Sequence, residues 1–222
     1  MTISTQATTV ITPTSHPELF ASMTLDDEAP TELWIRGNLD ALTSTQPSIT
    51  ITGARACTAY GAHVTAEITA DLATTHRIIT GGAYGIEATA TSTAHSRTPT
   101  VVVLASGIDR AYPSGHADLF DRVINAGGAL ISEVEPHMLP TRERFQRRQR
   151  LLAALSAASV IVEAGPRSGA LQVAHWGRRL DRPVAGIPGP ITSAASAGVH
   201  RLISDSTAQL TTSAAAIRAL LP

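Results

Sequence analysis

Short apolar runs alternate with helical segments along most of the chain. The apolar, β-branched runs lie at residues 48–53, 76–80, 100–105, 129–132, 159–164 and 183–189. Between them, apolar residues recur at helical spacing, at residues 58–75, up to about His95, at 116–126 and at 168–180. Short strands separated by helices are typical of βαβ units, whose parallel sheet is buried on both faces. The sequence therefore predicts an α/β fold of the Rossmann-like, doubly wound type, with a mainly parallel sheet and helices on both faces.

The chain is expected to contain one main domain. Residues 1–30 are rich in Thr, Ser, Pro and acidic residues and predict a loose leader. Residues 31–222 have a length that a single α/β domain often reaches. Residues 214–222 predict a short terminal helix, and we expect no further domain after it.

Composition narrows the class of function. The net charge is −1, so binding of a polyanion has to rest on a local patch of positive charge. All 17 basic residues are arginine, which removes lysine from every catalytic or phosphate-binding role and excludes a P-loop NTPase. The single cysteine excludes an internal disulfide and a cysteine-based metal cluster. Because a secretory signal and a membrane-spanning run are both absent from the sequence, we expect a cytoplasmic protein with no membrane contact, metal or cofactor.

The segment RERFQRRQR at residues 142–150 holds five arginines in nine residues and precedes an apolar helical run. Cations at the start of a helix oppose its dipole, a cost that makes sense where an anion binds nearby. Arg147 and Arg150 are three residues apart and would share one face of a helix, and Arg148 lies between them. Phe145 could stack on a base. The segment is a candidate anion site; the alternative is a solvated basic turn with Phe145 in the core.

Further candidate site residues follow the predicted strands, because ligands of an open parallel sheet bind beyond the carboxyl ends of its strands. Arg55 would place a phosphate-binding guanidinium in that crevice. Glycines after a strand let backbone N–H groups approach an anion, and Ser168 is a candidate N-cap of a helix. Tight turns, a surface ion pair and simple capping are the alternatives. The candidates of this kind are Gly53, Arg55, Gly81, Gly82, Gly85, Ser168 and Gly169.

The sequence offers no clear catalytic set. HExxH and GxSxG motifs are absent, and the eight histidines are scattered. Glu133, Glu135 and Glu163 follow predicted strands and could act as acids or bases, although such residues more often pair with arginines across a crevice. We therefore expect a binding protein rather than an enzyme.

Eight short motifs in a fixed order indicate a family. They are WIRGNLDAL, TGAR with Tyr60-Gly61 behind it, GGAYGIEATA, SGIDRAYPSG, LISEVEP, FQRRQRLLAALS, VIVEAGPRSGAL and RPVAGIPGP, spread over about residues 33–205. Together they resemble the DprA/Smf family, the DNA-processing proteins of bacterial transformation. The resemblance implies a homodimeric Rossmann-type domain that binds single-stranded DNA and loads a RecA-type recombinase onto it. In the family's basic pocket it places Arg55, Phe145, Arg148 and Arg150, with Gly53 and Gly85 shaping the loops.

Some positions depart from the family pattern. Gln149 stands where the family has asparagine, Glu87 replaces an aspartate, Thr91 a histidine and Val173 a common threonine. The family's N-terminal helical domain is missing or reduced to the leader, and we expect no C-terminal winged helix. The alternative function is a nucleotide-binding sensor or nucleotide hydrolase of the same superfamily, although the PGGxGTxxE motif of its phosphoribohydrolases is absent. A third interpretation is a protein that mainly dimerises and has little affinity for DNA.

Overall fold

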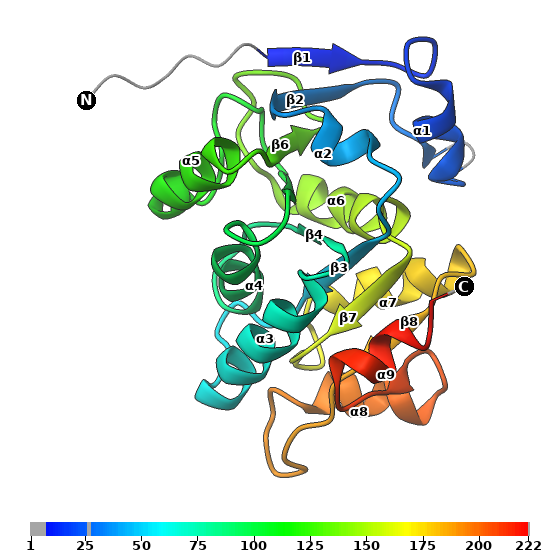
Figure 1. The fold of residues 1–222 in the computed structure, drawn as a ribbon. Coiled ribbons are helices and arrows are strands. Elements are labelled where there is room, and N and C mark those ends of the chain that lie inside the picture. Colours follow the sequence, from blue (N-terminus) through cyan, green and yellow to red (C-terminus); the bar gives the residue numbers. More distant parts are fainter. Residues whose placement is uncertain (1–7, 26–27, 222) are drawn as a thin grey trace.

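The computed structural model describes residues 8–25 and 28–221. Within these residues, one sheet of nine strands runs through the molecule in the order β1-β2-β6-β5-β4-β3-β7-β8-β9 (Figure 1). The strands are β1 (Thr8–Ile11), β2 (Leu33–Gly37), β3 (Ser48–Thr52), β4 (Arg77–Thr80), β5 (Thr100–Val103), β6 (Ala129–Ser132), β7 (Ala158–Ile161), β8 (Val184–Gly186) and β9 (Gln209–Leu210).

The sheet is mainly parallel, as the sequence predicts. Neighbouring strands from β6 through β9 in the sheet order all pair parallel, whereas β2 pairs antiparallel with both β1 and β6. From β3 the chain builds β4, β5 and β6 toward one edge, and then returns to place β7, β8 and β9 on the other side of β3. The strand order therefore reverses between β3 and β7, which is where an open α/β sheet binds its ligands.

Helices pack on both faces of the sheet (Figure 1). One face carries α3 (Ala59–Leu72), α4 (Ile86–Ala94), α5 (Ala117–Asn125) and α9 (Ala214–Arg218), and the other carries α6 (Arg142–Ala154), α7 (Ala170–Arg179) and α8 (Ala197–Ser204). Successive strand residues point to opposite faces. Ile78 therefore belongs to the apolar cluster of α3 and α4, whereas Ile79 belongs to that of α6 and α7. Burial on both faces explains why the strands are apolar throughout.

The prediction of a loose leader is wrong for residues 8–25. β1 pairs antiparallel with β2 at the edge of the sheet, and α1 (Pro17–Ser22) follows it. Phe20 and Met23 are buried in the same apolar cluster as α6 and α7. Because these few buried apolar residues lie among threonine, serine and proline, the composition of the segment did not indicate that it packs on the core. Residues 1–7 of the predicted leader lie outside the described residues.

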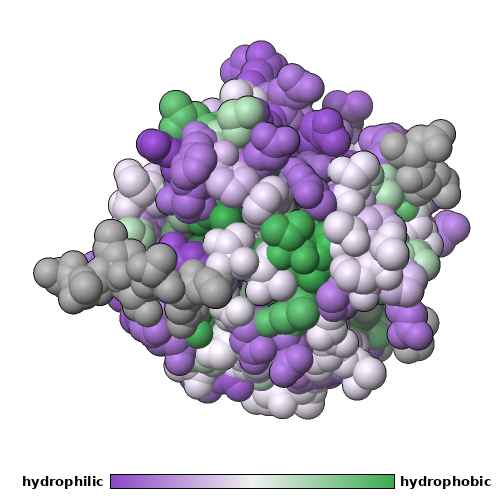
Figure 2. Space-filling view, turned by 90° about the horizontal axis from the view of Figure 1, so that it is seen from above, coloured by the Kyte–Doolittle hydropathy of each residue, from purple (hydrophilic) through white to green (hydrophobic). Residues whose placement is uncertain are grey.

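Two short elements join the larger ones, α2 (Asp40–Thr43) and a 3₁₀ turn at Ser114–His116. Figure 2 views the molecule from above the orientation of Figure 1 and shows mostly hydrophilic and neutral residues, with hydrophobic residues in small separate groups. Among the described residues, none of the helices has both the length and the apolar character needed to cross a membrane.

Candidate nucleic-acid interface

A groove opens at the carboxyl ends of β3 and β7, where the strand order reverses. One hollow of about 700 Å³ is lined by residues 52–56 after β3 and by residues 165–170 after β7. A second hollow, of about 450 Å³, lies between α6, α7 and α8. The two are continuous, because both are lined by Arg55, Gln149, Pro166, Arg167, Ser168 and Gly169. These two hollows together form what we call the basic groove.

Exposed arginines from four separate segments meet in the basic groove. They are Arg55, Arg142, Arg167 and Arg201. Two carboxylates also line the groove, Glu87 and Asp205. Glu87 pairs with the buried Arg148. A hydrogen bond from Thr207 holds the pKa of Asp205 below the usual range, so Asp205 stays ionised and offsets one cation. In a chain with a net charge of −1, this groove is a local concentration of positive charge suited to an anionic ligand.

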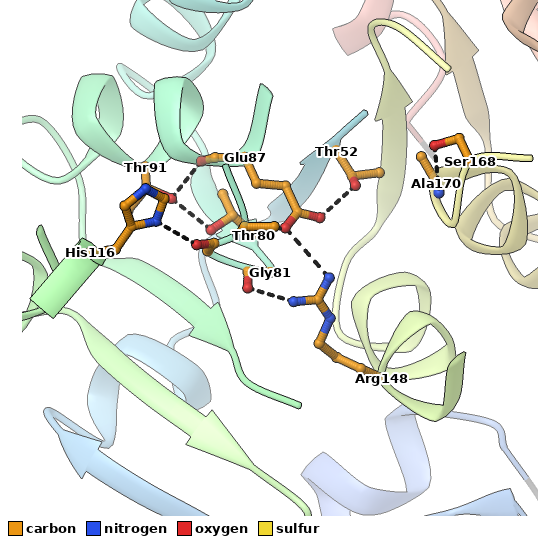
Figure 3. Close-up of polar contacts among 11 residues, drawn as sticks. Thr52, Thr80, Gly81, Glu87, Thr91, His116, Arg148, Ser168 and Ala170 are labelled. Carbon is orange, nitrogen blue, oxygen red and sulfur yellow. Dashed lines mark hydrogen bonds and ion pairs between the residues drawn. The ribbon is translucent and has the colours of Figure 1, made fainter. Parts of the chain in front are cut away.

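The N-terminus of α7 opens into the same groove. Its N-cap position is Gly169, and the Ser168 hydroxyl accepts a hydrogen bond of 3.3 Å from the N–H of Ala170 (Figure 3). The observed cap position is thus one residue after the predicted one, Ser168, whose side chain still accepts a hydrogen bond from the first turn. The positive end of the helix dipole adds to the attraction that the arginines exert on an anion.

Phe145 lies in the basic groove between two guanidinium groups. The Cζ atom of Arg55 is 4.6 Å from the ring centroid, and that of Arg148 is 5.3 Å from it. Tyr112 contacts the ring edge-on, with 6.0 Å between the centroids. Both cations attract the negative face of the aromatic ring, which holds it in a fixed orientation. The half-buried ring is therefore held by its neighbours, and the exposed Arg55 is the group that a base would displace in order to stack on it.

Arg148 is buried beneath this ring rather than exposed at the lip. Its side chain is 3% exposed, and it donates a 2.6 Å hydrogen bond to the Gly81 carbonyl and lies 3.5 Å from Glu87 (Figure 3). Burial lowers the pKa of Arg148, while Glu87 acts in the opposite direction, and a guanidinium remains charged at neutral pH. Glu87 also accepts a 2.6 Å hydrogen bond from Thr52. Arg148 therefore joins α6 to the ends of β3 and β4.

Arg150 does not line the basic groove, contrary to the prediction. Its guanidinium binds both oxygens of Glu133, at 2.8 and 2.5 Å, and its Nε donates to the Glu28 carbonyl at 2.7 Å. The side chain is 3% exposed, so these partners fix it inside the protein. Arg147 is 59% exposed, lies 3.5 Å from Glu133 and faces a different hollow. The three-residue spacing of Arg147 and Arg150 thus brings both guanidinium groups to Glu133.

The GGAYG glycines support the groove rather than line it. Gly81, Gly82 and Gly85 are absent from the lining, although Ala83 of this loop contributes to it. Gly85 has a φ of +75°, and a Cβ there would lie 2.3 Å from the carbonyl oxygens of both Ala54 and Arg55. The loop therefore packs directly under the backbone that carries Arg55. Of the predicted glycines, Gly53 and Gly169 do line the groove.

The lining residues that were not among the predicted site residues include Arg142, Gln149, Arg167 and Arg201. Arg142 and Gln149 lie inside the arginine-rich segment, but only the helical phase of α6 reveals that both face the groove. Gln149 is 7% exposed, and within the described residues its Oε1 atom has no hydrogen-bond partner. Arg167 precedes the predicted helix of α7, which was a usable signal. Arg201 comes from α8, which the sequence did not predict.

Two of the three strand-end glutamates have structural partners, whereas Glu135 is exposed and lines a different hollow. Glu163 accepts hydrogen bonds from the N–H and the hydroxyl of Thr58, at 2.9 and 2.6 Å, at the start of α3. Glu133 binds Arg150, and Glu87 is held by Thr52, Ala83 and Arg148. These carboxylates are engaged in fixing the ends of strands and helices to one another.

A family model described as DNA recombination-mediator protein A matches residues 7–222. The putative DNA processing protein DprA of Mycobacterium tuberculosis is 45% identical to the chain over 177 residues, which cover 79% of this chain and 45% of that protein. The chain therefore spans less than half the length of this relative.

Two solved structures share the fold. DNA processing protein A from Streptococcus pneumoniae superposes with a TM-score of 0.87 at 28% identity, over 98% of this chain and 75% of that one. The Helicobacter pylori protein, whose structure addresses its single-stranded DNA binding mode, gives a TM-score of 0.85 at 25% identity. This match covers 97% of our chain and 96% of that one. Together with the family model, these matches show that the chain belongs to the DNA recombination-mediator protein A family, the DprA/Smf family that its motifs resemble.

Proposed function

We propose that the protein binds single-stranded DNA in the basic groove and acts by binding rather than by catalysis. The observation that carries this proposal is the position of the half-buried Phe145 ring between Arg55 and Arg148, in a groove lined by exposed arginines. Guanidinium forks suit the backbone phosphates, and an aromatic face accepts any base. The single-stranded DNA binding described for the Helicobacter pylori relative is consistent with this assignment.

Stacking on Phe145 favours a single strand over a duplex. The ring lies inside a groove, so a base has to leave its own stack to reach the aromatic face. A base in a duplex would have to lose its partner first, at a cost of a few kcal/mol. Stacking on an aromatic side chain recovers about 1–3 kcal/mol per base, which a single strand obtains without the cost of unpairing.

The family resemblance supports three further parts of the proposal. The protein would act as a homodimer in the cytoplasm, and it would deliver the bound strand to a RecA-type recombinase. The structural roles of Glu87, Glu133 and Glu163 support binding without a chemical step, since none of them is presented to the groove as a carboxylate without partners.

Fluorescence anisotropy with a labelled oligonucleotide of about 16 nucleotides tests the proposal. The wild type is compared with an Arg55→Ala, Arg167→Ala double variant at about 50 and 200 mM salt. Both side chains are exposed, so the double variant should remain folded. We expect salt-sensitive binding in the wild type, and a plot of log affinity against log salt that is shallower in the variant by about 0.7 for each lost phosphate contact.

The matched control is Arg97→Ala, an exposed arginine between α4 and β5, at the amino end of β5 and thus at the opposite end of the strands from the groove. Equal losses in the control and the groove variant, or unchanged binding in the groove variant, would contradict the proposal. Competition with thymidine monophosphate separates the alternative function: displacement of the oligonucleotide by similar concentrations of the mononucleotide would indicate a nucleotide-binding site.

A further inference from the structure

A third hollow adjoins the basic groove on the outer side of α6 and α7. It has a volume of about 660 Å³ and is lined by Glu28, Gln146, Arg147, Arg150, Gln172 and Trp176. Gln146 and Gln172 also line the basic groove, so the two spaces share a boundary. A chain that occupies the basic groove can therefore continue past these two amides into the third hollow.

The end of this hollow carries an aromatic and guanidinium pair. Trp176 is half-buried, with part of its indole packed against the core beneath α7. The Cζ atom of Arg179 lies 4.5 Å from the centre of the Trp176 ring, and the Arg179 side chain is 61% exposed. Gln172, Trp176 and Arg179 are spaced four and three residues apart, so they share one face of α7. Arg179 itself is not among the residues that line the hollow, and the partly exposed indole is the surface there on which a base can stack.

Of the arginines around this hollow, Arg147 is the one available to bind a ligand. Arg150 holds Glu133 with two hydrogen bonds, and Arg179 lies 3.0 Å from Glu28. Arg147 reaches Glu133 at only 3.5 Å, and that carboxylate is already engaged by Arg150. With 59% of its side chain exposed, Arg147 can turn toward a phosphate without breaking a buried contact.

We infer that this hollow is a second station for the same single strand, an inference that rests on the proposed function of the basic groove. A base stacks on the Trp176 indole, a backbone phosphate pairs with Arg147, and Gln146 and Gln172 contact the strand between the two stations. The bound strand thus crosses from the ring of Phe145, over the α6 and α7 boundary, to the ring of Trp176. Short strands fill the basic groove alone, and longer ones occupy both stations.

Tryptophan fluorescence tests the second station directly. The chain has two tryptophans, so Trp34→Phe leaves Trp176 as the single reporter. This variant is titrated with oligothymidylates of about 4 and about 16 nucleotides, the two ends of the site sizes found for one single-strand binding fold. We expect the longer strand to quench Trp176 at the concentrations where anisotropy shows binding, and the shorter strand to bind without quenching it.

Affinity measurements provide the second readout. Trp176→Ala and Arg147→Ala should each weaken binding of the longer strand, by about fivefold or more for the tryptophan, and leave the shorter strand unaffected. Trp176→Phe keeps an aromatic ring and should lose less than Trp176→Ala. The unchanged affinity for the shorter strand also shows that each variant is folded. Arg97→Ala again serves as the control for loss of a surface cation.

The outcomes separate the two proposals. Arg55-dependent binding of both strands, with no quenching and no effect of Trp176→Ala, would overturn the second station and leave the basic groove intact. Equal losses for both lengths in Trp176→Ala would also overturn it, since the tryptophan would then act through the fold. Failure of the wild type to bind either strand would overturn both the proposed function and the second station.

Discussion

Two groups of arginines in this protein have the same chemistry and opposite surroundings. Arg148 and Arg150 are buried in α6, where carbonyl and carboxylate oxygens hold their guanidinium groups. The exposed group in the basic groove comes from four separate segments and is open to solvent. The arginine-rich segment that dominates the sequence therefore mainly shapes the site, while three of the four exposed groove cations come from elsewhere in the chain.

The difference follows from the cost of burying a charge. A guanidinium taken out of water loses several kcal/mol of hydration and has to recover it from well-placed partners. Arg150 recovers it from Glu133 and the Glu28 carbonyl, and those contacts leave little for a DNA phosphate. An exposed arginine keeps its hydration until a ligand replaces it, so it can bind and release a strand. Burial thus separates the arginines that hold the fold from those that are available to DNA.

The largest expected effect is on stability and comes from Arg150→Ala. The substitution leaves Glu133, whose side chain is 10% exposed, without its bidentate partner. Breaking a buried ion pair from one side costs about 3–5 kcal/mol, so we expect a loss of that order in the free energy of unfolding, measured in urea. Any folded protein that remains should bind an oligonucleotide of about 4 nucleotides as the wild type does, because Arg150 does not line the basic groove.

The matched control is Arg55→Ala, which should give the reverse pattern. Arg55 is exposed in the groove, so its removal should change the free energy of unfolding by less than about 0.5 kcal/mol while it weakens binding. Comparable losses of stability in the two variants would break the distinction between buried and exposed arginines. Loss of binding in folded Arg150→Ala would return that residue to the DNA site.

A smaller effect is expected at Gln149, which is buried like Arg148 but faces the groove. Within the described residues its Oε1 has no hydrogen-bond partner, a state that costs about 1–3 kcal/mol in a folded protein. Gln149→Leu keeps a side chain of similar length and removes the uncompensated oxygen. We therefore expect the free energy of unfolding to stay equal or to rise by up to about 1 kcal/mol, while affinity for the oligonucleotide falls.

Urea unfolding and anisotropy on the same preparation check the Gln149 variant. Gln149→Asn, which restores the residue typical of the family, is the comparison that keeps an amide in the groove. A destabilised Gln149→Leu protein with unchanged affinity would mean that the amide serves the fold and makes no contact with the bound strand.

The fold was predictable because its signal is local. The apolar runs at residues 48–53, 100–105 and 129–132 coincide with β3, β5 and β6, and the terminal helix is found as α9. The elements that the sequence did not predict are short or are fixed by a few apolar residues in otherwise polar segments. β1 and α1 are held by Ile11, Phe20 and neighbouring apolar residues in a segment otherwise rich in Thr and Ser. β9 has only two residues, too short for any periodicity.

The site was predictable only in part, because the phase of a helix decides which side chains face a groove. Four of the predicted site residues, Arg55, Phe145, Gly53 and Gly169, do lie together in the groove. Motif order could not distinguish Arg148, beneath the ring, from Arg142, beside it. The role of Gly85 also depends on a tertiary contact, since its missing side chain makes room for the Arg55 backbone. Arg201 had no signal, because its contribution arises from the packing of α8.

The smallest expected effect is on the pH dependence of stability and concerns a buried histidine rather than an arginine. His76 is buried far from the groove, and burial, with the nearby Arg218 as a smaller cause, lowers its pKa below the usual value near 6.5. The unfolded chain then binds a proton more readily than the folded protein, so stability is complete above about pH 6.5 and falls as the pH drops toward the folded-state pKa. His76→Gln should reduce this acid-side loss in urea unfolding at about pH 7.5 and 5.5, without changing oligonucleotide binding at pH 7.5. A profile as steep in His76→Gln as in the wild type would contradict the assignment, because the acid-side loss of stability would then come from groups other than this buried imidazole.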